Sequence, residues 1–117
     1  MTTAITVRPL SGSTDGRGLK IGATATPGTL IHTAQASATD MDAPEISVCN
    51  TSAADVAATF ECYGTTSPDD LLKRTIPAGE TVQVPIPPGR NGLVLRCFAG
   101  TTNVLVVFGC VKRVTVT

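Results

Sequence analysis

Short runs in which apolar and polar residues alternate recur along most of the chain, separated by residues that favour turns. The clearest run is "VAATFECY" at residues 56–63, which places Val56, Ala58 and Phe60 on one face and polar side chains on the other. A repeat of two residues is typical of a half-buried β-strand, because successive side chains of a strand point to opposite faces. Runs of this kind predict strands at residues 4–8, 19–24, 29–34, 45–50, 56–63, 81–86, 93–99 and 104–117.

The turns between these runs indicate the fold class. Segments such as "TPG" (26–28) and "PPGRNG" (87–92) separate the runs at intervals of about eight to twelve residues. We therefore expect one all-β domain, an antiparallel β-sandwich or barrel-like fold of about eight strands. Pro85 cannot donate to a strand ladder, so it indicates an edge strand or a strand end. Gly109, within the last run, indicates a bulge or a close backbone approach.

One segment, "SPDDLLKR" at residues 67–74, carries a helical signal. Ser67 is suited to cap a helix, Pro68 to its first position, and the two following aspartates to the positive end of the helix dipole. We expect one short helical turn there and no longer helix.

Alternation also predicts which side chains form the core. Phe60→Ala tests the prediction, because removing a buried ring is costly. The expected core residues are Ile46, Val48, Val56, Phe60, Val82, Val84, Leu93, Leu95, Val106 and Phe108.

The first seventeen residues have little core-forming pattern. Their sizeable aliphatic side chains are Ile5, Val7 and Leu10, and a polar connector, "SGSTDGRG", follows. Ordering an isolated segment of this kind costs about 1–2 kcal/mol per residue in backbone entropy. We therefore divide the chain into an N-terminal arm (1–17) and a β-sandwich domain (18–117), and expect a neighbouring chain to order the arm.

The amino-acid composition indicates which classes of partner the chain can bind. Nine basic and nine acidic residues give a net charge of zero, so the chain has no basic field suited to nucleic acid. Charged residues make up 15% of the chain, against roughly a quarter in ordinary domains, which favours a surface covered by other subunits. The N-terminal sequence has no signal-peptide pattern and no apolar run reaches the length of a membrane span. We expect synthesis in the cytoplasm and no membrane partner.

The four cysteines, Cys49, Cys62, Cys97 and Cys110, form no metal-binding spacing. Without an export signal, we expect reduced thiols that pack as small apolar side chains. Four cysteines allow three disulfide connectivities, and the sequence does not choose among them. If two disulfides were found, the pairings 49–62 and 97–110 would be favoured.

Candidate catalytic groups are few, and we expect neither an enzyme nor a cofactor. His32 is the single histidine, and no nucleophile and carboxylate stand at a recognised spacing from it, so we expect it to be packed or on the surface. Asp69 and Asp70 are neighbours and do not face each other as a catalytic pair would. Asp40 and Asp42 in "TDMDAP" lack the glycine and the distant glutamate of a calcium loop, so we expect no metal site.

Two stretches together carry a resemblance to a known family. "NTSAADVAATFE" followed by "YGTTSPDDLLKRTIPAGETV", and later "NGLVLRCFAGTTNVLVVFGCVKRVT", resemble a group of small virion structural proteins of tailed bacteriophages. The resemblance covers roughly residues 28–114 and rests on turn and strand signatures such as "NTS", "GTTSPDD", "IPAG" and "NGL". These signatures are not active-site residues, so no functional site carries over.

The resemblance implies a β-domain on the virion, either a capsid decoration or cement protein on the head surface or the base of a head spike, and we expect the decoration protein. We expect it to bind copies of itself, as a trimer or pentamer, and the major capsid protein or another virion protein. The alternative is a carbohydrate-binding module of a head spike or tail, and a hydrolase is a third, weaker hypothesis. Lys112 and Arg113 point to opposite faces of the last strand and either pair with acids of a neighbouring subunit or solvate an edge. The expected interface residues are Ile5, Val7, Arg8, Leu10, Lys112 and Arg113.

Overall fold

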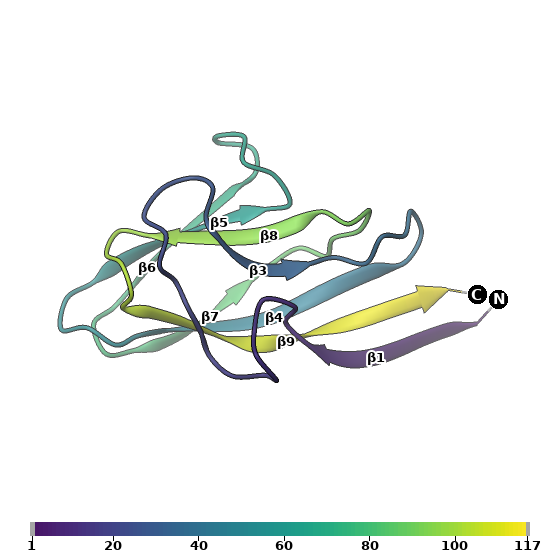
Figure 1. Cartoon of the computed structure of the whole chain (residues 1–117), viewed down its shortest axis with the longest axis horizontal. Helices are drawn as coiled ribbons and strands as arrows, with labels where there is room; N and C mark the ends of the chain where they lie inside the picture. Colours follow the sequence, from purple (N-terminus) through teal and green to yellow (C-terminus); the bar gives the residue numbers. More distant parts are fainter. Residues whose placement is uncertain (1, 117) are drawn as a thin grey trace.

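Two antiparallel sheets pack face to face in the computed structural model, which describes residues 2–116 (Figure 1). The first sheet has the strand order β1-β9-β4-β7, with β2 also paired to β9, and the second has the order β3-β8-β5-β6. Residues 2–116 form nine strands: β1 (Thr3–Pro9), β2 (Leu19–Lys20), β3 (Thr29–Thr33), β4 (Met41–Asn50), β5 (Val56–Cys62), β6 (Leu71–Ile76), β7 (Thr81–Pro85), β8 (Val94–Ala99) and β9 (Leu105–Val116). The predicted all-β sandwich is confirmed, and β7, which contains Pro85, lies at an edge of its sheet as expected.

The predicted helical turn at residues 67–74 is wrong, because the described part of the chain contains no helix. Residues 67–70 form a turn in which the Asp70 N–H donates to the Thr66 carbonyl at 2.9 Å, while the Asp70 carboxylate accepts from the Thr66 N–H at 3.0 Å. The next residues form β6, whose register with β5 runs from Glu61 opposite Leu71 to Val56 opposite Ile76. A helix of one or two turns is marginal by itself, so pairing with β5 decides the conformation.

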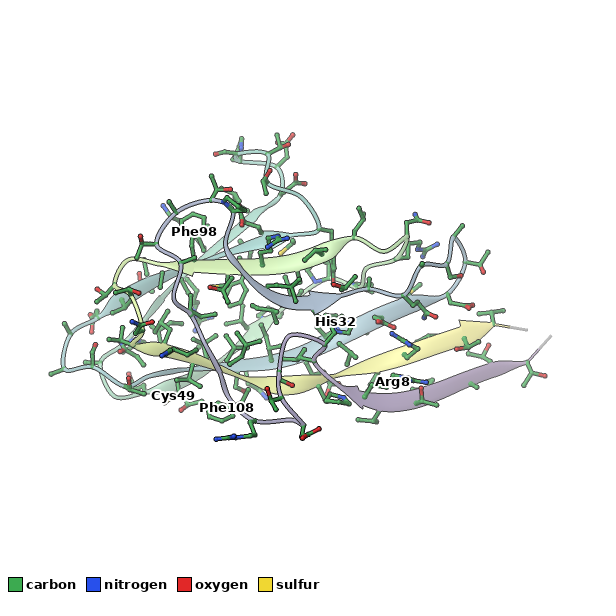
Figure 2. All side chains as sticks on the ribbon, in the orientation of Figure 1. Arg8, His32, Cys49, Phe98 and Phe108 are labelled. Carbon is green, nitrogen blue, oxygen red and sulfur yellow. The ribbon has the colours of Figure 1, made fainter. Side chains whose placement is uncertain are left out.

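Most of the predicted core is buried between the sheets, but the predicted phase of β9 is wrong and Leu93 lies just before β8 begins. Leu93 and Phe108 are each 46% exposed, and Val106 is half-buried. In β9 the inward side chains are Leu105 and Val107 instead, and Phe108 lies on the outer side of its sheet (Figure 2). Residues 104–108 are all apolar, so alternation could not indicate which of them face inward. The predicted residues that are buried are Ile46, Val48, Val56, Phe60, Val84 and Leu95, with Val82 packed against them.

Gly109 allows β4 and β9 to approach closely. Their register runs without a shift from Met41 opposite Val114 to Asn50 opposite Leu105, so β9 has no bulge against β4. A Cβ atom at Gly109 would overlap the carbonyl oxygen of Glu45. Of the two interpretations of this glycine, close backbone approach is the one that the structure supports.

The N-terminal segment is ordered by its own chain. Strand β1 pairs with the end of β9, from Thr3 opposite Val116 to Pro9 opposite Cys110, and all seven of its residues are exposed. The next residue, Leu10, is 1% exposed and belongs to the core, and the Gly12 N–H donates to the Ile31 carbonyl at 2.9 Å. A neighbouring chain is therefore not needed to order this segment, since β9 supplies backbone partners for residues 3–9 and Ile31 supplies one for Gly12. The molecule is elongated, measuring 50 × 28 × 20 Å, and β1 with the end of β9 projects at one end (Figure 1).

All four cysteines are free thiols. Cys49 and Cys110 alternate with inward-facing neighbours and so lie on the outer side of the first sheet, whereas Cys97 is fully buried and Cys62 packs against the core from the second sheet. A bond from 49 to 62, or from 97 to 110, would have to pass through the first sheet, so neither pairing fits this fold.

We expect alkylation without reductant to label four cysteines per unfolded chain, as measured by intact mass. In the folded protein Cys97 should react last, because it is buried and burial raises the pKa of its thiol to about 12. Cys49 and Cys110 should react first. Fewer than four labels on the unfolded chain, or early labelling of Cys97, would contradict the assignment.

Candidate functional site

The projecting end of the first sheet carries most of the residues expected at an interface. We call β1 together with residues 110–116 of β9 the β1–β9 ribbon. Ile5 and Val7 are 63% and 69% exposed and lie on one face of the ribbon together with Lys112, which is opposite Val7. Arg8 is exposed on the other face (Figure 2). Leu10 lies in the core, so its side chain is not available to another chain.

Lys112 and Arg113 both pair with acids of their own chain. The Lys112 Nζ atom lies 2.8 Å from Glu45 Oε1, and both side chains remain about half exposed. Arg113 turns to the inner face, where Nε donates to Asp42 Oδ1 at 2.8 Å and Nη2 donates to Oδ2 at 3.0 Å. Neither cation therefore depends on a neighbouring subunit for an acidic partner.

A buried polar cluster surrounds Asp42, which is fully buried between the two sheets. Besides the two bonds from Arg113, its carboxylate accepts from Gln35 Nε2 at 3.3 Å and lies 2.7 Å from His32 Nε2. Burial alone would raise the pKa of Asp42, but the hydrogen bonds from Arg113 and His32 outweigh it and hold the pKa below its usual value. Asp42 is therefore a charged carboxylate whose bonds are all within the fold.

His32 is 2% exposed and uses both ring nitrogens. Its Nδ1 atom accepts from the Ser11 backbone N–H at 3.0 Å, so the ring proton lies on Nε2 and is donated to Asp42. The Ser11 hydroxyl in turn accepts from the Thr33 N–H at 2.7 Å. No ring nitrogen is left to act as a general base, so the cluster connects the N-terminal segment to β3, β4 and β9 rather than forming a nucleophile–base pair.

A second buried carboxylate is Glu61, which no motif in the sequence indicates. It is 1% exposed and accepts from the Thr26 hydroxyl and from the Gly28 N–H at 2.6 Å. Arg96, opposite Glu61 in the sheet, donates to the Gly28 carbonyl at 3.2 Å. Together these contacts hold the loop before β3 over the outer side of the second sheet. Among the described residues, no buried side-chain nitrogen or oxygen lacks a hydrogen-bond partner.

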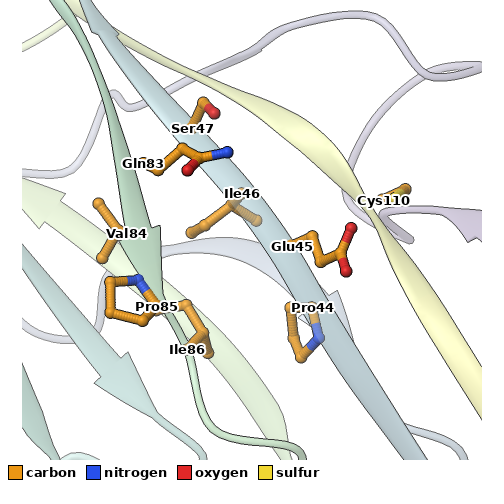
Figure 3. A pocket seen from close by; sticks show the side chains of 9 residues that line it. All are labelled: Pro44, Glu45, Ile46, Ser47, Gln83, Val84, Pro85, Ile86 and Cys110. Carbon is orange, nitrogen blue, oxygen red and sulfur yellow. The ribbon is translucent and has the colours of Figure 1, made fainter.

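A shallow hollow of about 840 Å³ lies beside β4 and β7 (Figure 3). Its one ionised group is Glu45, which is already paired with Lys112, and it contains no aromatic ring on which a sugar could stack. It offers no pair of groups for acid–base chemistry. The lining residues are Pro44, Glu45, Ile46, Ser47, Gln83, Val84, Pro85, Ile86 and Cys110.

The remaining acidic candidates lie apart or have structural partners. Asp40 accepts from the Val116 N–H at 2.9 Å, while Asp70 closes its own turn. Within residues 2–116, no group of three or more His, Cys, Asp or Glu side chains is placed to hold a metal ion. The same residues include no helix that is long and apolar enough to cross a membrane.

Comparison of the chain with protein-family models, with curated proteins and with solved structures finds no match.

Proposed function

We propose that this chain is a structural virion protein of a tailed bacteriophage, a capsid decoration or cement protein that binds the head lattice and stabilises it. One observation carries the proposal beyond the resemblance: the buried ionic groups all serve the fold, while exposed aliphatic side chains gather on the projecting β1–β9 ribbon. A protein built this way acts through contacts with other proteins. The major capsid protein, or another virion protein, is the proposed partner, at the capsid surface after assembly in the host cytoplasm.

The ribbon is suited to such contacts for two reasons. Ile5 and Val7 expose more than half of their side chains, and covering them in a contact would remove apolar surface from water. The outer face of the ribbon, which carries Ile5 and Val7, is also exposed at the projecting end of the sheet, so a partner can reach it without disturbing the core (Figure 1).

Binding to phage heads that lack the protein tests the proposal. We expect the full chain to sediment with such heads and to saturate at a fixed number of copies per head. A variant without residues 2–8 keeps Leu10 and the His32 cluster, so it should stay folded but bind at least about tenfold more weakly, a loss of about 1.4 kcal/mol. Heads that bind neither form, or both equally, would contradict the proposed contact.

The alternative function is a carbohydrate-binding module of a head spike or tail. The hollow beside β4 and β7 is its best candidate site, but none of the nine residues that line it is aromatic. A glycan array separates the two functions: the decoration protein should bind no glycan, and specific binding would favour the alternative.

A further inference from the structure

The outer edge of β1 has unpaired backbone groups. Strand β1 is the last strand on its side of the first sheet, so nothing in the described chain pairs with its outer edge. The direction in which the N–H and C=O groups of β1 point follows from the hydrogen bonds that β9 makes on its two sides. The Val116 N–H donates to Asp40, on the side of β4, whereas the Leu105 carbonyl accepts from Ile21, on the side of β1 and β2. Because these directions alternate along a strand, odd-numbered residues of β9 bond to β1.

The register of β1 against β9 then shows which backbone groups of β1 are already paired. Thr6 lies opposite Arg113, and Arg8 lies opposite Val111, so the even-numbered residues of β1 exchange hydrogen bonds with β9. The N–H and C=O groups of Ile5 and Val7 therefore point away from β9, off the edge of the sheet. The two side chains with the most exposed aliphatic surface thus belong to the residues whose backbone groups are available for pairing.

This edge has few of the features that prevent pairing between molecules. Natural edges are protected by charged residues, bulges or short strands, whereas β1 has seven residues and no register shift against β9. Its one charged residue, Arg8, lies on the face away from Ile5 and Val7. Pro9, which lacks an N–H, limits the pairing only at the end of the strand.

We propose that two copies of this chain pair through β1, antiparallel, about a two-fold axis at Thr6. The pairing places Ile5 opposite Val7 of the second copy, Arg8 opposite Ala4, and Thr6 opposite its own counterpart. Only this register, centred on the middle residue of β1, pairs the strand over its full length, with roughly six new backbone hydrogen bonds. It gathers the four Ile5 and Val7 side chains on one face and sets no like charges opposite each other.

A second copy fits this edge because the strand is complementary to itself. The chain has no net charge, so two copies do not repel each other at long range. The two first sheets would become one continuous sheet across the axis. Such a dimer does not depend on the proposed virion function. It also differs from the expected trimer or pentamer, since a two-fold contact alone does not close a ring of odd number.

The mass of the purified full chain in solution, followed by light scattering across a dilution series, tests the pairing. Wild type should be a dimer. The double substitution Ile5→Lys with Val7→Lys places like charges opposite each other across the axis and should weaken the dimer at least about tenfold. The matched variant, Ile5→Lys with Val7→Glu, places opposite charges there and should restore most of the association.

Both side chains are exposed, so both variants should unfold at nearly the wild-type temperature. A wild-type chain that is monomeric throughout, a dimer that survives the double lysine substitution, or a charge-swapped variant as weak as the double lysine one would each overturn the pairing. A dimer that fails to bind heads would instead contradict the proposed function and leave the pairing intact.

Discussion

Replacing Asp42 by asparagine should lower the free energy of unfolding by about 3 kcal/mol. The amide keeps the size of the carboxylate but removes its charge, so Arg113 loses its ionic partner. Arg113 is only 25% exposed on its side chain, and water cannot fully replace the lost charge. His32 also loses the charged acceptor of its Nε2 proton. Chemical denaturation followed by circular dichroism measures the change.

The matched control is Glu45→Gln, which removes the same charge from the same strand. Glu45 lies on the outer side of the sheet and is 58% exposed on its side chain, so its pair with Lys112 is screened by water. The free energy of unfolding should hardly change. Equal losses in the two variants would mean that burial of Asp42 does not determine its contribution.

The Asp42 cluster also contributes to the pH dependence of the free energy of unfolding. The pKa of Asp42 lies below its usual value in the folded protein. Its contribution is therefore fully present above the ordinary carboxyl pKa of about 3.9, and it is lost as the pH falls through the lower pKa of the folded state. Asp42→Asn should lack this part of the acid dependence. If the stability of Asp42→Asn fell as steeply with decreasing pH as that of the wild type, the acid dependence would come from other groups.

Phe60→Ala should cost about 3–5 kcal/mol of stability, because the ring is completely buried in the core. Phe108→Ala removes the same ring from the outer side of the first sheet, where the side chain is 46% exposed, and should cost under about 1 kcal/mol. Thermal unfolding of the two variants compares them directly. If Phe108 proved the costlier position, the inward phase assigned to β9 would be wrong.

The alternation of apolar and polar residues predicts a strand and its inward face only where one face of the strand is polar. The run around Phe60 has such a polar face, whereas residues 104–108 have none, and there the sequence misplaced Val106 and Phe108. Strand β6 was missed because "LLKRTI" does not alternate, and its conformation depends on pairing with β5. Helix signals at Ser67 and Pro68 are local, and the pairing of distant segments overrode them.

The Asp42 cluster joins groups that are distant in the sequence, so spacing could not reveal it. Asp42 and His32 are separated by ten positions, and Asp42 and Arg113 by 71. The sequence nevertheless indicated that Asp42 faces inward, because it lies an even number of residues before the buried Ile46 and Val48 of the same strand. Starting that strand at residue 41 instead of 45 would have placed a carboxylate on the inner face, where a buried charge requires a partner.

Imaging of purified bacteriophage particles assembled with this protein labelled tests the proposed function most directly. If the chain decorates the capsid, the label should occupy positions that repeat regularly over the head surface and should be absent from particles made without the protein. Particles without label on the head, or with label only at the tail, would contradict a role as a head decoration protein.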